Sequence, residues 1–277
     1  MFQNVVAIIS GGASGLGAAT ASYLVRNGAR VVVADLPQAQ EQFLKLLETT
    51  TSATSADGSN ISGGSLKFAE TDVRSEDDVS LALDMAEGEF GEQVNVAVNC
   101  AGIAPARKTL SQKVNENGTV THRLHSLEEY ARTISVNAIG SFNLARLASD
   151  RMAHRSADTD GLRGCIVNTA SVAAYDGQIG QVAYASSKGA VVGMTLPMAR
   201  DLAPLGIRVM TVAPGLFMTP LLAGLPEKVH KQLVQNVPCP SRLGDPMEYA
   251  KLVGSILQNP YLNGEVIRLD GALRMPP

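Results

Sequence analysis

Short apolar runs, many of them rich in valine and isoleucine, recur along the chain, and longer segments with helical spacing separate them. Runs of this length predict buried strands, and their alternation with helices predicts a parallel sheet joined by helical crossovers. The 277 residues are enough for one full-sized core, so we predict a single α/β domain that spans residues 1–277. We expect about seven strands, at residues 5–9, 31–35, 65–69, 94–99, 165–170, 206–212 and 265–270.

Three segments interrupt this alternation. Residues 49–64 are small and polar, which predicts a surface loop. Residues 105–123 are longer and more basic than their surroundings, so they form either a rim for an anionic substrate tail or a solvated loop. Residues 127–147 predict a long helix whose apolar stripe is broken by Asn137 and Gly140. The basic side chains of residues 105–123 are Arg107, Lys108, Lys113 and Arg123.

A glycine-rich turn follows the first predicted strand. The run Ser10-Gly-Gly-Ala-Ser-Gly-Leu-Gly17 joins that strand to a helical pattern that begins at Ala18. Its glycines let the backbone approach a pyrophosphate, whose charge is favoured by the N–H groups at the helix start. The second strand ends in Asp35, an acid placed to take both hydroxyls of a ribose. Strand, glycine turn, helix and acid together predict a Rossmann-type, doubly wound sheet that binds a dinucleotide.

A second group of residues predicts proton transfer. Tyr184 and Lys188 are four residues apart, which places them on one face of a helix. A phenol can act as a base near neutral pH only if its pKa is lowered, and a lysine cation about 4 Å away supplies an interaction of the required size. Ser171 follows the fifth strand and could hydrogen-bond a substrate oxygen. These three residues predict an acid–base site at a carbonyl or hydroxyl group.

The glycine turn, the acid, the serine, the tyrosine and the lysine, in this order, resemble the short-chain dehydrogenase/reductase family. The resemblance covers nearly the whole chain, apart from insertion-like stretches at residues 50–65 and 110–124. Residues 11–17, 214–220 and 240–246 resemble the branch of the family that acts on 3-hydroxyacyl-CoA and hydroxysteroids.

The resemblance implies an NAD-dependent oxidoreductase that interconverts a secondary alcohol and a ketone, on 3-hydroxyacyl-CoA, hydroxysteroid substrates, or both. In this scheme Tyr184 removes the hydroxyl proton and Lys188 lowers the pKa of Tyr184 and holds the ribose. Ser171 positions the substrate oxygen. Asn137 binds a water that relays protons from Lys188 to solvent; structural capping of a helix kink is the alternative for Asn137.

The resemblance also implies a set of cofactor contacts. Asp72 and Val73 contact the adenine, although Asp72 could instead cap the next helix. Cys100 lies beside the cofactor in a turn where the family has asparagine, and it is not interpreted as a nucleophile. Phe217 and Thr219 contact the nicotinamide end. The full predicted set is Gly11, Ser14, Gly15, Leu16, Gly17, Asp35, Asp72, Val73, Cys100, Tyr184, Lys188, Phe217 and Thr219.

Features around the substrate are predicted in less detail. Gln178 lies in the loop between the serine and the tyrosine, so it could face bound substrate together with Ser171. Residues 216–240 predict a movable lid over an apolar substrate, although core packing would produce the same apolar stripe. Family members commonly form homotetramers through the last strand and the helix that contains Tyr184.

Asp35 decides the predicted cofactor. Its carboxylate pairs with a ribose diol and repels a 2′-phosphate, and neither Ser14 nor Leu36 supplies a cation to offset this. NAD is therefore predicted over NADP. A 3-oxoacyl carrier-protein reductase would prefer NADPH, and it remains the alternative enzyme. A dinucleotide-binding scaffold protein is the alternative from another class.

Composition disfavours several other functions. The formal net charge of −3 gives no basic surface for nucleic acid, and no apolar run is long enough to span a membrane. Of four histidines only His122 and His125 are near one another, so no metal site is predicted. Three cysteines without a close pair indicate a reducing compartment. The branch resemblance implies mitochondria, whereas the amino terminus lacks a transit pattern and taken alone indicates the cytosol.

Overall fold

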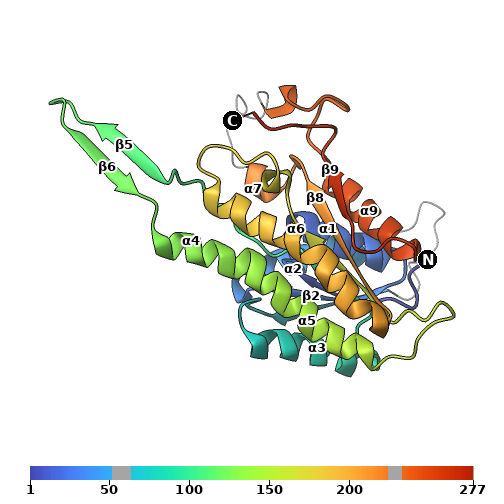
Figure 1. Cartoon of the computed structure of the whole chain (residues 1–277). Helices are drawn as coiled ribbons and strands as arrows, with labels where there is room; N and C mark the ends of the chain where they lie inside the picture. Colours follow the sequence, from blue (N-terminus) through green and yellow to red (C-terminus); the bar gives the residue numbers. More distant parts are fainter. Residues whose placement is uncertain (52–63, 224–232, 277) are drawn as a thin grey trace.

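The computed structural model describes residues 1–51, 64–223 and 233–276, and its central feature is a parallel sheet with helices on both faces (Figure 1). Within these residues the sheet has seven strands, in the order β3-β2-β1-β4-β7-β8-β9. This confirms the predicted doubly wound α/β fold. The strands are β1 (Val6–Ser10), β2 (Arg30–Asp35), β3 (Ser65–Glu70), β4 (Val96–Asn99), β7 (Gly164–Thr169), β8 (Ile207–Pro214) and β9 (Val266–Leu269).

The strand order reverses between β1 and β4, which leaves a crevice at the carboxyl edge of the sheet. Helices α1 (Gly15–Arg26), α2 (Gln40–Thr51) and α9 (Pro246–Gln258) lie on one face. Helices α3 (Glu76–Phe90), α5 (Gly140–Ala153) and α6 (Val182–Leu202) lie on the other, and α4 (Leu127–Ile134) packs against α6. Shorter helical turns are η1 (Pro37–Ala39), η3 (Val172–Ala174), η4 (Ala203–Leu205) and α7 (Pro220–Ala223).

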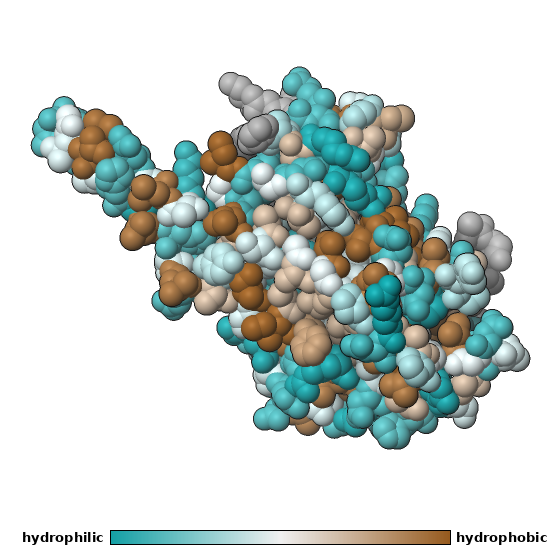
Figure 2. Space-filling model, viewed as in Figure 1, coloured by the Kyte–Doolittle hydropathy of each residue, from teal (hydrophilic) through white to brown (hydrophobic). Residues whose placement is uncertain are grey.

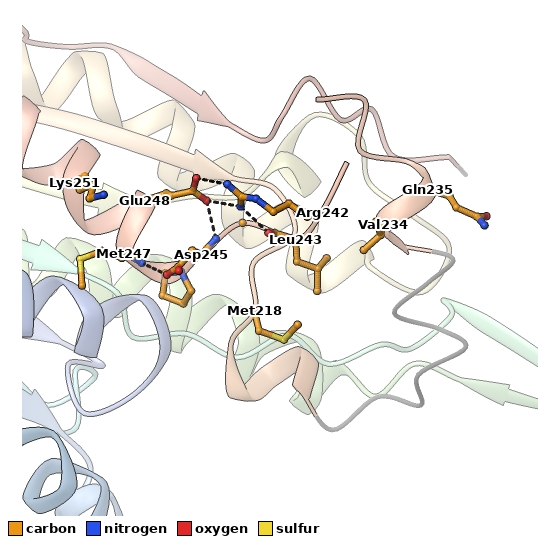
Figure 3. A pocket seen from close by; sticks show the side chains of 11 residues that line it. Met218, Val234, Gln235, Arg242, Leu243, Asp245, Met247, Glu248 and Lys251 are labelled. Carbon is orange, nitrogen blue, oxygen red and sulfur yellow. Dashed lines mark hydrogen bonds and ion pairs between the residues drawn. The ribbon is translucent and has the colours of Figure 1, made fainter. Parts of the chain in front are cut away.

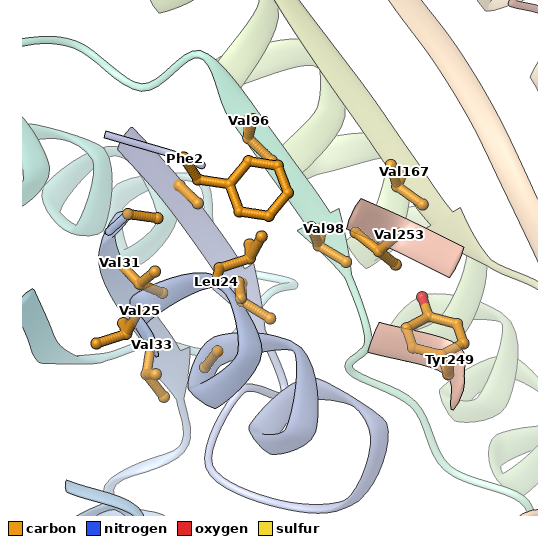
Figure 4. Packing of buried hydrophobic residues seen from close by; sticks show 14 of the residues in the cluster. Phe2, Leu24, Val25, Val31, Val33, Val96, Val98, Val167, Tyr249 and Val253 are labelled. Carbon is orange, nitrogen blue, oxygen red and sulfur yellow. The ribbon is translucent and has the colours of Figure 1, made fainter. Parts of the chain in front are cut away.

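Each face of the sheet has its own apolar core. Strand residues alternate between the two, so Ile9 packs with Leu24 of α1, whereas Ile8 packs in the cluster that contains Leu144 of α5. Figure 4 shows the first cluster, in which Tyr249 of α9 brings a phenol among the valines of the central strands. Burial on both faces explains why the strands read as continuous apolar runs.

The helix predicted at residues 127–147 is interrupted at the residue that the sequence singled out. Helices α4 and α5 are joined by a π-helical turn over Ser135–Ile139, and Asn137 is buried within it. A π turn inserts one residue into the helical ladder and often marks a functional site. Here it turns the amide of Asn137 toward the backbone of Ile103.

The predicted loop at residues 105–123 is instead largely a β-hairpin, and it projects away from the body of the molecule (Figures 1 and 2). Strands β5 (Leu110–Val114) and β6 (Val120–Leu124) pair antiparallel, with Leu110 opposite Leu124 and Val114 opposite Val120. The pair Asn117-Gly118 lies in the connecting turn, where Gly118 has φ of +79°. Asn-Gly between alternating residues is a hairpin signal, so the sequence held the information that the loop prediction missed.

Two predicted segments lie partly outside the described residues. The loop expected at 49–64 begins later, because α2 continues to Thr51, and residues 52–63 are not described. The lid predicted at 216–240 includes residues 224–232, which are also outside the described chain, so its movement stays a prediction.

Candidate active site

A cavity of about 820 Å³ opens at the carboxyl edge of the sheet. Its walls come from the glycine turn, from the segments that follow β2, β3, β4, β7 and β8, and from the first turns of α6. The structure thus brings together all the predicted site residues except Asn137, which lies behind the wall. These residues are Gly11, Ser14, Gly15, Leu16, Gly17, Asp35, Asp72, Val73, Cys100, Ser171, Gln178, Tyr184, Lys188, Phe217 and Thr219.

The glycine turn fits a dinucleotide pyrophosphate, although two of its glycines serve another purpose than predicted. A Cβ on Gly11 would lie 2.7 Å from Ala101 Cα, and one on Gly17 would lie 2.3 Å from the carbonyl oxygen of Gly11. Both glycines therefore allow close packing of the protein's own backbone. In the described structure the side chain of Ser14 makes no capping hydrogen bond to α1, so its hydroxyl and the first N–H groups of the helix can receive an anion.

Asp35 is fixed at one end of the cavity. Its carboxylate accepts hydrogen bonds from the backbone N–H of Ala13, at 3.0 Å, and from that of Leu36, at 2.8 Å. These bonds attach the end of β2 to the glycine turn and orient the carboxylate. A ribose diol bound beside the glycine turn would find this acceptor already in place.

Asp72 has a different local role from the helix cap considered above. Its carboxylate pairs with Arg74, with Nη2 and Oδ2 2.5 Å apart, and this hydrogen-bonded pair holds the pKa of Asp72 below its usual value. The cap of α3 is Ser75, whose hydroxyl accepts from the backbone N–H of Asp78 at 3.1 Å. Asp72 and Arg74 both line the cavity, and the contact of Asp72 with adenine stays a prediction.

Ser171, Tyr184 and Lys188 meet at the other end. Ser171 is two residues beyond the end of β7, and its hydroxyl accepts from the backbone N–H of Ala173 at 3.1 Å. Tyr184 and Lys188 occupy successive turns of α6, and the Lys188 ammonium lies 5.8 Å from the centre of the Tyr184 ring. The same ammonium donates to the carbonyl oxygen of Thr169 at 2.8 Å.

The predicted lowering of the Tyr184 pKa is wrong for this geometry. Burial raises the pKa of Tyr184, and a hydrogen bond with Ser171 lowers it by less. Burial also lowers the pKa of Lys188 to about 8, because the cation has little water around it. The helical spacing brings the ammonium to the tyrosine, but desolvation of both groups outweighs their attraction in the protein alone.

Asn137 lies immediately behind the cavity wall. Its side chain donates to the carbonyl oxygen of Ile103 at 2.9 Å and accepts from the Ile103 N–H at 2.8 Å. A Cβ placed on Gly102 would lie 3.2 Å from the Asn137 oxygen and 3.6 Å from the Lys188 nitrogen. Asn137 therefore holds the segment after β4 against Lys188, and its part in a proton relay stays a prediction.

Cys100 lies in a buried polar cluster that sequence reasoning did not find. The Thr169 hydroxyl is 2.7 Å from that of Tyr249, and the sulfur of Cys100 is 3.6 Å from the first and 3.7 Å from the second. Burial raises the pKa of the Cys100 thiol, so it is a poor nucleophile here. The cluster fixes Thr169, whose carbonyl oxygen holds Lys188.

The remaining predicted contacts are arranged as follows. Phe217 lines the cavity but is otherwise buried in the core against Gly244, and Thr219 lies beside Gly15. Gln178 lines the cavity, yet its amide nitrogen donates to the carbonyl oxygen of Pro276 at 3.0 Å, so this amide binds the protein's own chain.

Several cavity-lining residues had no signal in the local sequence. They come from segments that the motifs do not include: Ile103, Arg132, Val136, Gln181 and Met275. The basic residues predicted as a rim, in contrast, are absent from the described lining. Arg107 lies 3.7 Å from Glu129, and the hairpin carries Lys113 and Arg123 outward.

A second cavity, of about 1010 Å³, lies near the start of α9 (Figure 3). Met218, Leu243 and Met247 give it an apolar wall, and the ion pair between Arg242 and Glu248 lies along it. None of the predicted site residues is among the described side chains that line it. The smaller cavity is therefore the candidate active site.

Comparison with known proteins identifies the family of the chain. The sequence profile of the short chain dehydrogenase family matches residues 5–230. The chain belongs to this family. Short-chain dehydrogenases are oxidoreductases, and this chain is accordingly a dehydrogenase that acts on CH–OH groups with a nicotinamide dinucleotide.

Its relatives within the family are similar over nearly their whole length. The chain is 54% identical over 277 residues to 3-hydroxyacyl-CoA dehydrogenase type-2 of Homo sapiens, covering 99% of this chain and 97% of the relative. It is 52% identical to the protein of the same name from Drosophila melanogaster, covering 100% of both. A crystal structure of 3-hydroxyacyl-CoA dehydrogenase type-2 from Mycobacterium avium has a TM-score of 0.85 and 38% identity, covering 100% of this chain and 98% of that chain.

Two further observations concern the described residues of this dehydrogenase. No helix among them is long and apolar enough to cross a bilayer. Nor do they bring together three or more histidine, cysteine, aspartate or glutamate side chains in a way that could hold a metal ion.

Proposed function

We propose that this protein oxidises the secondary alcohol of a 3-hydroxyacyl-CoA, a hydroxysteroid, or both, with NAD as the electron acceptor. The observation that carries the proposal is the meeting of Ser171, Tyr184 and Lys188 at one end of a cavity whose other end holds Asp35 and the glycine turn. The three relatives compared above are named for the first of these substrate classes.

The protein's own groups divide the reaction between binding and proton transfer. The Ser171 hydroxyl donates to the substrate oxygen, and the Tyr184 oxygen takes the hydroxyl proton. Lys188, held by the Thr169 carbonyl, places a cation beside the phenol, and that cation favours the phenolate. When bound, the nicotinamide supplies the acceptor for the hydride that leaves the carbinol carbon.

Asp35 supports NAD over NADP. Its carboxylate is held in place by two backbone N–H groups, so it cannot turn away from a 2′-phosphate without losing both hydrogen bonds. Like charges at close range in a partly buried site are strongly unfavourable. Arg74 is the nearby cation, and its guanidinium is already paired with Asp72.

The cavity supports an apolar substrate with an anionic portion. Around the reacting end the wall includes Val136, Val172 and Met275, whereas the exposed Arg132 of α4 is a cation on the same wall. An acyl chain fits the first group, and the phosphates of a CoA thioester would be attracted to the second. A steroid has no such phosphates and would contact the apolar wall alone.

We also propose that the protein is a homotetramer of a reducing intracellular compartment, with mitochondria implied by its branch of the family. Exposed apolar side chains gather on α4, α5 and α6, where Figure 2 shows brown and tan side chains on the surface. The three cysteines are free thiols in the structure, as a reducing compartment requires.

Replacing Tyr184 with phenylalanine tests the proposed chemistry. Tyr184→Phe should lower kcat for a 3-hydroxyacyl-CoA by at least about 1,000-fold, because the base is lost, and should leave the Kd for NAD nearly unchanged. Turnover is followed by absorbance of the reduced cofactor, and Kd by calorimetry. Tyr261→Phe, at a 98% exposed tyrosine, is the matched control.

The same assay separates the alternatives. Retained turnover in Tyr184→Phe would reject the role of this residue, and equal use of NAD and NADP by the native protein would reject the assignment of NAD. A preference for NADPH with 3-oxoacyl substrates would indicate a carrier-protein reductase. Binding of NAD without turnover of any substrate would indicate a scaffold.

A further inference from the structure

The last residues of the described chain return to the active-site cavity. After β9 the chain turns at Asp270-Gly271-Ala272, where Gly271 has φ of +59° and Ala272 has φ of +65°. A non-glycine residue in this region is strained and needs support from its surroundings. The support is a hydrogen bond from the Ala272 N–H to the carboxylate of Asp270, at 3.0 Å.

Leu273 anchors the segment beyond this turn. Its side chain is completely buried, and its carbonyl oxygen accepts from the guanidinium of Arg268 at 3.0 Å. Arg268 is on the edge strand β9, so the anchor connects the segment directly to the sheet. The residues that follow Leu273 therefore start from a fixed point.

An ion pair joins this anchor to the loop between Ser171 and Tyr184. The guanidinium of Arg268 lies 2.6 Å from Asp176 and 2.7 Å from Asp270, and the ring of Tyr175 lies 5.2 Å from the same guanidinium. The side chains of Asp176 and Arg268 are only 16% and 22% exposed, so the pair is weakly screened by solvent. One arginine thus holds the active-site loop and the end of the chain together.

The connection continues along the segment. The backbone of Met275 interacts with the Asp176 carboxylate, and Arg268 together with this interaction lowers the pKa of Asp176. Gln178 donates from its amide nitrogen to the carbonyl oxygen of Pro276 at 3.0 Å. Met275 is fixed on both sides, and it is the residue of this segment that lines the cavity.

We propose that residues 273–276 form a fixed wall at the substrate end of the cavity, and that Met275 sets the size of the apolar group that the enzyme accepts. The bonding partners Asp176 and Gln178 lie between Ser171 and Tyr184, which places Met275 at the reacting end, away from Asp35 and Asp72. A methionine packs well against acyl chains or rings because its thioether is flexible and polarisable. The identity of the substrate class rests on the proposed function.

In this arrangement Asp176, Arg268 and Gln178 are positioning residues. They do not need to touch the substrate, because they act by holding the segment that carries Met275. The wall is held by a partly buried ion pair and by the hydrogen bonds of Arg268 to Leu273 and of Gln178 to Pro276, so it resists displacement by a long or branched substrate. On the side formed by residues 273–276, the cavity therefore selects substrates by size.

The test uses Met275 variants of the full chain and a series of 3-hydroxyacyl-CoA thioesters from four to sixteen carbons. Met275→Phe should lower the ratio of kcat/KM for the longest substrate to that for the shortest by about 10-fold, because added volume at a fixed wall cannot be accommodated. Met275→Ala should raise the ratio by about 3-fold or more. Met85→Ala, at an exposed methionine of α3, is the matched control and should leave it unchanged.

Variants of the supporting bonds separate a positioning role from simple destabilisation. Gln178→Glu keeps the size of the side chain but presents a carboxylate to the Pro276 carbonyl, so it should release the wall and raise the same ratio. Asp176→Asn should change the ratio in the same direction. A ratio that stays at the native value in Met275→Phe, Met275→Ala and Gln178→Glu would overturn the proposal.

Binding measurements distinguish failure of this proposal from failure of the proposed function. Calorimetric titration with decanoyl-CoA measures the affinity of the cavity for an acyl chain without turnover. Met275→Phe should weaken this binding by about 10-fold. A native protein that binds decanoyl-CoA with this dependence on Met275 but oxidises no hydroxyacyl thioester would reject the proposed reaction alone. Binding that is equal in the native protein and Met275→Phe would reject the wall.

Discussion

At Lys188 the proposed role in the active site and the folding stability of the protein are directly opposed. Lys188 is 5% exposed and its ammonium has the carbonyl oxygen of Thr169 as its partner, so the protein holds a cation where water is nearly excluded. Burial lowers its pKa to about 8. Keeping this charge near Tyr184 therefore lowers the stability of the folded chain, as is common at functional sites of enzymes.

Replacing Lys188 with methionine should remove this cost. Between pH 8 and the ordinary pKa of lysine, the unfolded chain binds a proton that the folded chain does not, so the contribution of Lys188 to stability rises with pH across this window. Below about pH 8, burial of the charged lysine lowers the free energy of unfolding by on the order of 3 kcal/mol. The methionine variant regains this amount but loses about 1 kcal/mol with the hydrogen bond to Thr169. Lys188→Met should therefore unfold at a higher Tm than the native protein at neutral pH, and the difference should shrink by about pH 10.

Calorimetry of the two proteins at several pH values checks this. Lys251→Met, at an exposed lysine, is the matched control for removal of a lysine charge. A Lys188→Met protein less stable than the native one at neutral pH would mean that the bond to Thr169 outweighs desolvation.

Residue identities in the site could be predicted, but their electrostatics could not. Tyr184 and Lys188 were found from a spacing of four residues, and the structure places them on successive turns of α6. The pKa of Tyr184 depends instead on how much water surrounds it, which follows from packing by segments distant in sequence. Met275 was missed for the same reason, because no local pattern marks a residue that reaches the cavity through the bonds of Asp176 and Gln178.

Among the elements, the β5–β6 hairpin contributes least to the fold. Nine of its ten strand residues are exposed and the tenth, Ser111, is intermediate, so it buries little apolar surface within the chain. Its two ends are adjacent, because His125 donates from its backbone N–H to the carbonyl oxygen of Thr109 at 2.9 Å. A two-stranded hairpin alone is marginally stable in water.

Excision of the hairpin should consequently be tolerated. Replacing residues 110–124 with Asn-Gly should change the Tm by no more than about 2 °C, because surface changes away from the core usually alter stability by less than about 0.5 kcal/mol. Differential scanning calorimetry measures the Tm, and titration with NAD confirms that the site is intact. A larger fall in Tm would indicate that another copy of the chain covers the hairpin.

Elements of the sheet were predictable because each strand is buried on both faces and reads as an apolar run. The hairpin was misread as a loop because exposed strands lack such a run, and only the turn at Asn117-Gly118 carried a signal. The π turn was located from the polar Asn137 in an apolar stripe, but its geometry depends on the backbone of Ile103, which lies in another segment.

For the whole molecule, exposed apolar side chains on α5, α6 and the π turn before α5 favour association with other copies of the chain. Phe142 and Ile139 are 50% and 54% exposed, and Leu196 on α6 is 45% exposed. Gly189 and Gly193 have open space above them, which allows a helix of another copy to approach closely. A charge placed in the middle of this face would be buried without a partner if the copies associate.

Phe142→Glu should accordingly reduce the proposed tetramer to two chains or one. Size-exclusion chromatography with light scattering gives the mass directly. Leu81→Glu, at a 67% exposed leucine of α3, is the matched control and should leave the assembly at four chains. An unchanged mass in Phe142→Glu would place the interface elsewhere.

The position of Arg268 on β9 makes two segments that are far apart in the sequence depend on one side chain. Its guanidinium binds the Asp176 carboxylate in the loop before Tyr184 and the carbonyl oxygen of Leu273 after β9. A substitution at Arg268 would disturb both segments together, although Arg268 is not among the described residues that line the cavity.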